Sequence, residues 1–225
     1  DLIMARNPKD WDITTNANPA QIQNIFPRTV YENTFGTVGV VTEIDDVLLS
    51  EKQDSLRVVE VTPYRTEGKY IDSRHPEMVV FVQSLEEDLS RRDFTVNAIA
   101  YDPVKGVLKD PFAGEKDIKD KIIRTVGNPE ERFSEDALRL MRAVRFSAQL
   151  EFSIENDTQE AIKVLHGKLS LISIERIRDE FVKILLSDNP MLGLFMCNAL
   201  GLLQHFLPEL EMGVHVKQNQ AHSFD

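Results

Sequence analysis

Apolar positions recur along this chain with two different patterns, and the change falls near residue 127. Before it, short runs of Val, Ile, Thr and aromatic residues alternate with polar stretches, which is typical of strands on a pleated surface. Such runs occupy residues 12–15, 36–41, 56–62 and 78–82. A helix is predicted at residues 19–25, between the first two runs. The first half of the chain is therefore predicted to be a mixed α/β domain.

The second half has a helical pattern. Ser134 precedes two acidic residues and a run to residue 150 without Gly or Pro, so it is predicted to cap a helix there. Asn189 and Pro190 are typical of a cap followed by a first-turn proline. Further helices are predicted at residues 156–166, 174–186 and 190–203. This half is therefore predicted to be all-helical.

The composition is that of an ordinary globular protein. Of the 225 residues, 42% are hydrophobic and 28% are charged, which argues against disorder over most of the chain. Lys and Arg total 26 against 37 Asp and Glu, which gives a formal net charge of −11. This acidic balance argues against a general nucleic-acid coat, although it does not exclude a local basic groove.

The same composition bears on the cellular location. The longest apolar stretch, residues 191–203, is shorter than the ~20 residues of a membrane helix and is interrupted by Asn198. We therefore expect no membrane association. Cys197 is the only cysteine, which excludes an internal disulfide and a multi-cysteine zinc site. A reducing, cytoplasmic location is expected.

Two aspartates, Asp10 and Asp12, stand at the start of the first predicted strand. Residues two apart on a strand point to the same face, and neighbouring carboxylates repel unless a cation lies between them. A magnesium ion that also binds substrate phosphates is one explanation, and a solvated turn is the other. Glu60, in the apolar run 58–62, either faces outward on an alternating strand or points inward as a third metal ligand.

Paired arginines form the next candidate feature. Arg91 and Arg92 follow the acidic residues 86–88. Arginines can bind a phosphate through forked, charge-assisted hydrogen bonds. The alternative is a surface cluster of ion pairs between these arginines and the acidic residues before them.

The predicted helix after Ser134 carries a third candidate feature. Asp136 and Arg139 are neighbours at a spacing of three, and Arg142 and Arg145 extend a basic ridge along the helix. A solvated, salt-bridged helix face is the usual meaning of such a pattern. However, three arginines exceed what a neutral face requires in a chain of charge −11, and local positive charge in an acidic protein favours an anionic ligand.

Taken in order, these segments resemble the class II tRNA nucleotidyltransferases, which are the CCA-adding enzymes and their bacterial poly(A) polymerase relatives. The resemblance is carried by residues 7–19 (NPKDWDITTNANP), 86–98 (EEDLSRRDFTVNA), 110–114 (DPFAG), 135–146 (EDALRLMRAVRF) and 173–178 (SIERIR). It covers nearly the whole chain and implies an α+β fold. A nucleotidyltransferase head with a mixed five-stranded sheet and helices would be followed by an all-helical neck and a partial body.

The resemblance also implies boundaries for these parts. The head is expected at residues 1–125, the neck with the nucleotide-selecting helix at 126–200, and the start of the body at 201–225. In the family a Gly-Gly-x-Val-Arg phosphate loop precedes the residue that matches Asp1, and further body and an RNA-gripping tail follow the end. The chain is therefore expected to be a fragment, for which self-association or a second fragment would supply the missing parts.

The resemblance implies a role for each candidate residue. Asp10 and Asp12 would hold two Mg²⁺ ions, with Glu60 as a third catalytic acid. Arg92 would contact the incoming nucleotide. Asp136 and Arg139 would select the base, because a carboxylate beside a guanidinium matches cytosine and adenine and opposes guanine and uracil. The remaining two arginines of the nucleotide site, Arg142 and Arg145, are better suited to phosphate binding or helix support.

The implied activity is the template-independent addition of C and A, from CTP and ATP, to the 3′ end of tRNA. The alternatives are an A-adding or CC-adding partial enzyme, a bacterial poly(A) polymerase, or a catalytically silent RNA-binding module. Residues 60–68 resemble the CCA-adding type better than the poly(A) polymerases. A charged, Gly-containing stretch at residues 68–77 corresponds to a loop that the family uses in switching from C to A addition.

Overall fold

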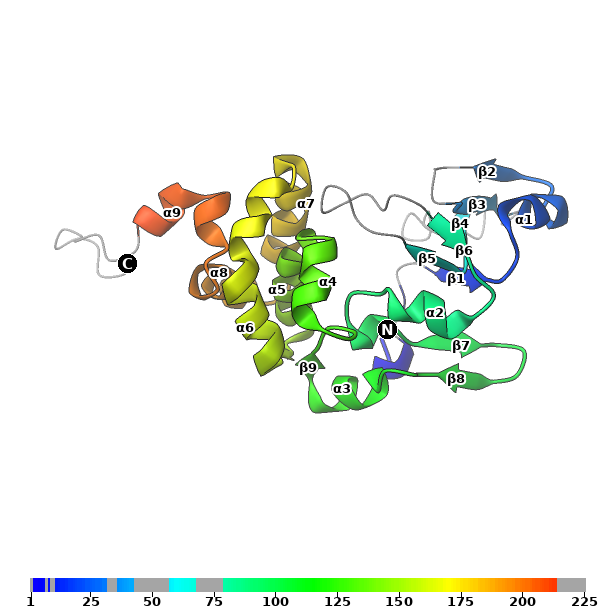
Figure 1. The fold of residues 1–225 in the computed structure, drawn as a ribbon, viewed down its shortest axis with the longest axis horizontal. Helices are drawn as coiled ribbons and strands as arrows, with labels where there is room; N and C mark the ends of the chain where they lie inside the picture. The colour runs from blue at the N-terminus through cyan, green and yellow to red at the C-terminus, as the bar shows by residue number, and fades with distance from the viewer. Residues whose placement is uncertain are drawn as a thin grey trace. The chain divides into compact units, whose positions relative to one another are not determined.

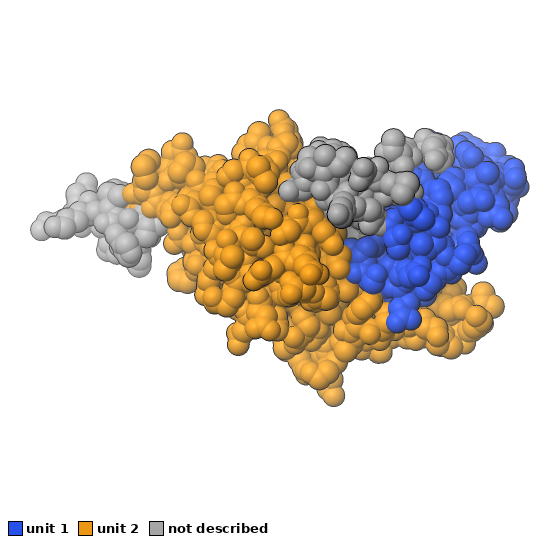
Figure 2. Space-filling model, in the orientation of Figure 1, with its two compact units in different colours: residues 1–69, 76–91 blue, residues 70–75, 92–225 orange. Residues whose placement is uncertain are grey.

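The fold is seen in a computed structural model (Figure 1), which describes residues 2–6, 8, 11–31, 36–42, 57–67 and 79–213. The chain divides into two compact units (Figure 2). Unit 1 contains residues 1–69 and 76–91, and unit 2 contains residues 70–75 and 92–225. Each unit has its own secondary structure and is described separately.

Unit 1 is built on a mixed sheet. In spatial order its strands are β1 (Asp12–Thr15), β4 (Val58–Pro63), β3 (Val38–Val41) and β2 (Thr29–Tyr31). β1 runs parallel to β4, and the other neighbours are antiparallel. The expectation of a five-stranded sheet was wrong, because within the described residues this sheet has four strands. After Pro63, which has no backbone N–H to donate, the chain forms β5 (Arg65–Glu67), which pairs with β6 (Val79–Phe81) instead.

A small apolar core lies on one face of this sheet. Ile22, Val38, Val40 and Val61 are each at most 7% exposed and pack together. Ile22 comes from α1 (Pro19–Ile25), which therefore covers this face. Side chains alternate along β4, so that Glu60, directly before Val61, is exposed. The opposite face of the sheet carries Glu60 together with Val58, which is 40% exposed.

Capping residues determine where the helices of unit 1 begin. The Asn18 side chain accepts from the Gln21 backbone N–H, and the Gln21 side chain accepts from the Asn18 backbone N–H, at 2.9 and 2.8 Å. This capping box begins α1. Ser84 caps α2 (Leu85–Ser90) in the same unit. The remaining elements of unit 1 are η1 (Leu2–Met4) and α2 (Leu85–Ser90).

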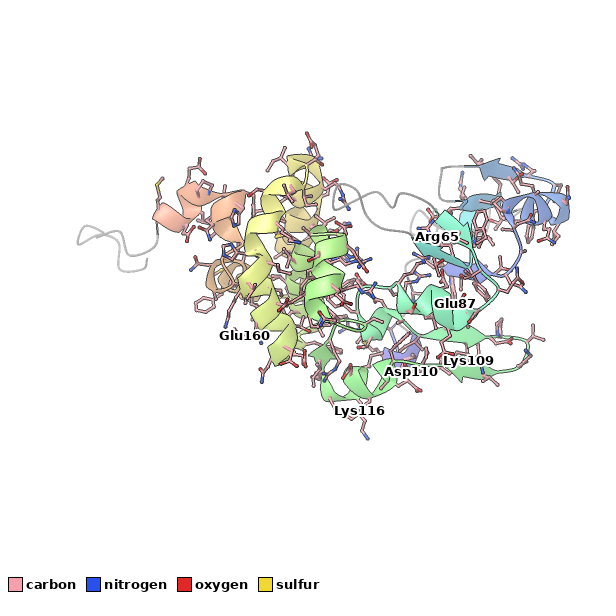
Figure 3. The ribbon with its side chains drawn as sticks, viewed as in Figure 1. Arg65, Glu87, Lys109, Asp110, Lys116 and Glu160 are labelled. Atoms are coloured by element: carbon pink, nitrogen blue, oxygen red, sulfur yellow. The ribbon has the colours of Figure 1, made fainter. Side chains whose placement is uncertain are left out.

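The first part of unit 2 combines short strands with one helix. Its elements are η3 (Thr95–Asn97), β7 (Ala100–Asp102), β8 (Val107–Lys109), α3 (Gly114–Asp120), β9 (Ile122–Ile123) and β10 (Ser153–Ile154). β7 and β8 are antiparallel, and β9 and β10 are parallel. Asp110, labelled in Figure 3, accepts from the Gly114 and Glu115 backbone N–H groups at 2.7 and 2.9 Å and so caps α3.

The rest of unit 2 is helical, as expected for this part of the chain. Its elements are α4 (Pro129–Glu135), α5 (Leu138–Leu150), α6 (Asn156–Leu165), η4 (His166–Leu171), α7 (Ile174–Leu185), α8 (Pro190–Ala199), η5 (Leu203–His205) and α9 (Pro208–Met212). α5 packs against both α7 and α8, and nine of its thirteen residues are buried. It is therefore the central helix of this unit. Among the described residues, no helix is both long and apolar enough to cross a bilayer.

Two helix boundaries differ from those predicted. Ser134 lies inside α4 and caps nothing, because the Asn128 side chain accepts from the Glu131 N–H at 3.1 Å and Pro129 follows at the first turn. The helix then breaks at Asp136, which is extended at φ −141° and ψ 106°. α8 ends at Ala199, before residue 203, since Gly201 takes a positive φ of 72° that ends the helical run.

Candidate functional site

Two carboxylates are neighbours on the face of the unit 1 sheet that lies opposite its apolar core. Asp12 on β1 and Glu60 on β4 are register partners in the parallel pair. Register partners point to the same face, and adjacent strands lie ~4.8 Å apart. On the other side of Glu60, its partner on β3 is Gly39, which has no side chain. Glu60 therefore faces outward and not inward. Because it lies beside Asp12 on that face, the outward orientation does not separate it from the predicted metal ligands.

The donor chemistry of this pair fits a hard divalent cation. Both residues are exposed, and neither carboxylate has an ion pair or a hydrogen bond within the described part of the chain. Two unpaired carboxylates at adjacent positions repel each other, and Mg²⁺ prefers such oxygens together with phosphates. No group of three or more His, Cys, Asp or Glu ligands occurs among the described residues. Asp10, the other predicted ligand, lies outside the described residues, as do residues 68–77.

The two adjacent arginines have separate environments. Arg91, in unit 1, forms an ion pair of 2.7 Å with Asp88 and donates to the Arg65 carbonyl at 3.0 Å. Asp88 is fully buried, so this contact joins α2 to β5. Arg91 therefore pairs with one of the acidic residues before it, as the ion-pair alternative expected, but the pair is buried and not at the surface. Arg92 is half-buried and begins the described part of unit 2.

Asp93 lies at the centre of a buried hydrogen-bond network in unit 2. Its carboxylate accepts from Arg142 Nε at 2.7 Å, from Asn97 Nδ2 at 3.0 Å and from the Phe94 backbone N–H at 2.8 Å. Burial alone would raise the pKa of Asp93. The charge of Arg142 and the hydrogen bonds from Asn97 and Arg142 outweigh burial and hold the pKa below its ordinary value.

Asp136 lies between α4 and α5, and both of its carboxylate oxygens have partners. Oδ1 accepts from the Leu138 backbone N–H at 3.0 Å, which caps the start of α5. Oδ2 accepts from Arg176 Nη2, on α7, at 2.9 Å. The side chain of Asp136 is 18% exposed. It is therefore held in one orientation at the N-terminal end of the central helix.

Arg139 is placed one turn further along. Its Nη1 donates to Glu135 Oε2 at 2.6 Å and to the Arg132 carbonyl at 3.1 Å. Arg132 itself forms an ion pair of 2.8 Å with Glu135. The Arg139 backbone N–H donates to the Asp136 carbonyl at 3.0 Å. Asp136 and Arg139 are thus neighbours, but the counter-charges of their side chains come from Arg176 and Glu135.

The last two arginines of the ridge both lie close to a phenyl ring. The guanidinium carbons of Arg142 and Arg145 lie 5.3 and 4.3 Å from the centroid of Phe146, within the range of cation–π attraction. Arg145 forms an ion pair of 3.2 Å with Glu180, which is 4% exposed. Burial lowers the pKa of Arg145, and Glu180 acts in the opposite direction.

The structure thus brings Asp136 and the three arginines of α5 together with their partners. Each arginine has a carboxylate neighbour, and these neighbours are Glu135, Asp93 and Glu180. The excess positive charge that favoured an anionic ligand is therefore balanced within the unit. Sequence reasoning gave no role to these three acids or to Arg176. Asp93 and Glu180 are 49 and 35 residues from their partners on α5, and Arg176 is 40 residues from Asp136, so helical spacing could not find these three. Glu135 is four residues from Arg139, a spacing that helix periodicity could have indicated.

The comparisons with known proteins agree with this architecture. The model of the poly A polymerase head domain matches residues 1–124, and that of the probable RNA and SrmB-binding site of polymerase A matches residues 151–213. The CCA-adding enzyme of Lactobacillus helveticus is 49% identical over 81% of this chain and 43% of its own length. That of Geobacillus kaustophilus is 43% identical over 98% of this chain and 52% of its own length.

A solved structure is similar as well. The crystal structure of the Bacillus stearothermophilus CCA-adding enzyme in complex with CTP superposes with a TM-score of 0.79 at 40% identity, over 92% of this chain and 47% of that one. The chain therefore spans about half the length of the relatives that it matches. The head-domain model alone covers more than half of the chain. The chain thus belongs to the poly(A) polymerase head-domain family, that is, to the tRNA nucleotidyltransferases and poly(A) polymerases that its motifs resemble.

Proposed function

We propose that the chain is part of a template-independent nucleotidyltransferase that adds C and A, from CTP and ATP, to the 3′ end of tRNA. The observation that carries this proposal is the placement of Asp136 and Arg139 at the start of α5, where the Arg139 backbone N–H donates to the Asp136 carbonyl and each side chain has fixed partners. The names of the relatives support it, since the curated proteins cited above are CCA-adding enzymes and the solved one contains CTP.

Base selection follows from the chemistry of this pair. Cytosine and adenine both present an exocyclic amino donor beside a ring-nitrogen acceptor. Asp136 can accept from the amino group and Arg139 can donate to the ring nitrogen. Guanine and uracil present a carbonyl beside a ring N–H, which places acceptor against acceptor and donor against donor. Each bidentate base contact is worth ~1–3 kcal/mol of discrimination, which suffices to separate CTP and ATP from GTP and UTP.

Asp12 and Glu60, together with Asp10, would hold the Mg²⁺ ions of the proposed site. When bound, Mg²⁺ supplies charge neutralisation at the triphosphate and activation of the tRNA 3′-hydroxyl. The protein's own task is to align that hydroxyl with the α-phosphate. Arg92 is proposed to contact the incoming nucleotide. Arg142 and Arg145 are proposed to support α5, in keeping with their contacts to Asp93 and Glu180.

The other expectations from the resemblance remain proposals. They are a head at 1–125, a neck at 126–200, the start of a body at 201–225, and self-association or a second fragment that completes the enzyme. A cytoplasmic location is proposed on the basis of the tRNA substrate and of the unpaired, buried Cys197.

The test combines nucleotide binding with incorporation. The chain is titrated with CTP, ATP, GTP and UTP in the presence of Mg²⁺, and each nucleotide is offered in labelled form with tRNA that lacks its 3′ end. We expect binding of CTP and ATP in preference to GTP and UTP, and incorporation of C and A. Incorporation of A alone or of C alone would identify a partial enzyme, and long A tracts would identify a poly(A) polymerase. Equal binding of all four nucleotides without incorporation would contradict the proposal and favour a silent RNA-binding module.

A further inference from the structure

Two imidazole rings face each other in the helical part of unit 2. His166 begins η4, which follows α6, and His205 ends η5, which follows α8. The atoms His166 Nδ1 and His205 Nε2 lie 2.7 Å apart, and the ring centroids are 5.0 Å apart with an interplanar angle of 35°. The two residues are 39 positions apart in the chain. Their contact joins η4 to η5, and the proposed nucleotidyl transfer gives it no role.

The backbone around η5 holds this pair in place. Gly201 has a positive φ of 72°, and a Cβ at this position would lie 3.3 Å from the His166 ring. The His205 backbone N–H donates to the Leu202 carbonyl at 3.1 Å, and the Leu202 N–H donates to the Cys197 carbonyl at 2.8 Å. Both histidines are half-buried. The pair is therefore fixed by its surroundings but is not enclosed in the core.

Hydrogen bonding shows where the ring protons can reside. In a hydrogen bond between two neutral imidazoles, one of the facing nitrogens carries the proton, yet each ring has a second nitrogen that can carry it instead. His205 Nδ1 lies 3.2 Å from Ser170 Oγ, which can accept its proton. His166 Nε2 has no hydrogen-bond partner within the described residues and can donate to water. With both protons on these outer nitrogens, two lone pairs face each other and can bind one cation.

The donor atoms determine which cation fits. Imidazole nitrogens suit late divalent transition metals such as Zn²⁺ and Ni²⁺, whereas Mg²⁺ prefers oxygen. At a metal–nitrogen distance of ~2.0–2.1 Å, two nitrogens on neighbouring corners of one ion lie ~2.9–3.4 Å apart. The rings of His166 and His205 would have to separate by only a few tenths of an ångström to reach this spacing. Ser170, through His205 Nδ1, supplies the kind of outer contact that orients a metal-binding imidazole.

We propose that His166 and His205 form a two-histidine site for a divalent transition-metal ion, Zn²⁺ or Ni²⁺, which joins η4 to η5. No group of three or more His, Cys, Asp or Glu occurs among the described residues, so water completes the coordination. Binding is therefore expected to be weaker than at structural zinc sites with four protein ligands. Because the two imidazoles meet only in the folded chain, the ion stabilises the fold. The inference is independent of the proposed nucleotidyl transfer.

The experiment follows thermal melting of the chain with Zn²⁺ or Ni²⁺ as the probe, in excess Mg²⁺ so that carboxylate sites are occupied. We expect the melting temperature of the wild-type chain to rise by roughly 5–10 °C at an ion concentration about 100 times the dissociation constant. His166→Gln and His205→Gln are each expected to lose most of this rise, because a single imidazole remains. If neither ion changes the melting temperature of the wild-type chain, the two rings share only a proton and the inference is wrong.

The other histidines of the chain provide the control. They lie outside the described residues and are His75, His215 and His222. They remain in the double variant His166→Gln/His205→Gln, so binding at any of them would persist when the pair is removed. His75→Gln is the matched single change and is expected to keep the wild-type response. If the folded double variant keeps the wild-type rise, the ion binds elsewhere and the inference is wrong.

Ser170→Ala keeps the test decisive if the histidine variants fail to fold. Ser170 is exposed, so its substitution is expected to preserve the fold. The loss of its contact with His205 is expected to weaken ion binding about tenfold, the usual effect of removing an outer-shell partner. Equilibrium dialysis measures the dissociation constants. An affinity equal to that of the wild type would overturn the assignment of the ion to this pair.

Discussion

Asp12 and Glu60 are register partners on two parallel strands, and both carboxylates lie on the exposed face of the sheet. They are 48 residues apart in the chain, and the sheet alone makes them neighbours. Like charges at adjacent strand positions destabilise a sheet. A fold that places them together, with no ion pair to either carboxylate among the described residues, is therefore suited to a cation that neutralises both.

This relationship predicts how the chain responds to divalent cations. Without Mg²⁺, Asp12→Asn is expected to raise the stability by roughly 0.2–1 kcal/mol, because the repulsion is removed. With millimolar Mg²⁺, the melting temperature of the wild-type chain is expected to rise and that of Asp12→Asn to change less. Glu60→Gln should behave in the same way if both carboxylates bind the ion. Thermal melting measures the three responses. If the melting temperatures of all three proteins change equally with Mg²⁺, the two carboxylates do not share a metal site.

A second prediction concerns Asp136. Asp136→Ala removes the acceptor for the exocyclic amino group but leaves the triphosphate contacts unchanged. The preference for CTP over UTP is expected to fall about tenfold, and the affinity for inorganic triphosphate is expected to stay close to that of the wild type. Competition binding with the four nucleotides and with triphosphate measures both quantities. An unchanged base preference would exclude the selecting role of this carboxylate.

The extent of successful prediction differs between local and distant contacts. β1 and α1 begin and end at the predicted residues, because alternation and the Asn18 cap are encoded within a few positions. The break at Asp136 was missed, since residues 134–150 contain no Gly or Pro and the local propensity favours one continuous helix. The earlier start at Asn128 and Pro129 could have been found, as both are ordinary helix-start signals.

In the candidate site, too, local features were predicted and distant contacts were not. The sequence identifies Asp136 and the arginines of α5 as a charged helix face, but not the acids that neutralise it. Asp93 and Glu180 reach α5 from 49 and 35 residues away. Such pairs depend on how the segment before η3 and the helix α7 pack against α5. The periodicity of a single helix carries no information about that packing. For this reason the three arginines of α5 do not by themselves require an anionic ligand, although the sequence alone suggested one.

The ion pair of Asp93 and Arg142 gives a prediction about stability. The side chains are 7% and 30% exposed, so Asp93→Asn would leave a largely buried guanidinium without its counter-charge. Breaking a buried pair by removing one partner costs about 3–5 kcal/mol, and the exposure of Arg142 favours the lower end. Urea denaturation measures the loss. Asp120→Asn is the matched control, because Asp120 forms an exposed ion pair with Lys116, the residue labelled in Figure 3, and no measurable loss is expected there.

The depressed pKa of Asp93 also predicts a dependence on pH. Because the folded state holds the proton less tightly than the unfolded state, the stability from this group is present above the ordinary carboxyl pKa of ~3.9. It is lost as the pH falls through the lower, folded-state pKa. The wild-type chain should therefore lose stability more steeply below about pH 4 than Asp93→Asn does. Urea denaturation at a series of pH values between 5 and 2.5 measures the free energy of unfolding of both proteins. If the two curves run parallel, Asp93 is not ionised in the folded state.

The DPFAG segment, residues 110–114, received no individual role from the sequence, and the structure predicts one for its glycine. A Cβ on Gly114 would overlap the Thr95 backbone carbonyl and would lie 2.8 Å from the Ile99 side chain. The carbonyl cannot move without disturbing η3, which adjoins the network of Asp93. Gly114→Ala is therefore expected to destabilise the chain by roughly 1–3 kcal/mol, the usual cost of overpacking. Gly167→Ala is the control, since a Cβ there meets nothing within 4 Å. If urea denaturation gave equal stabilities for the two variants, the close approach of α3 to η3 would be wrong.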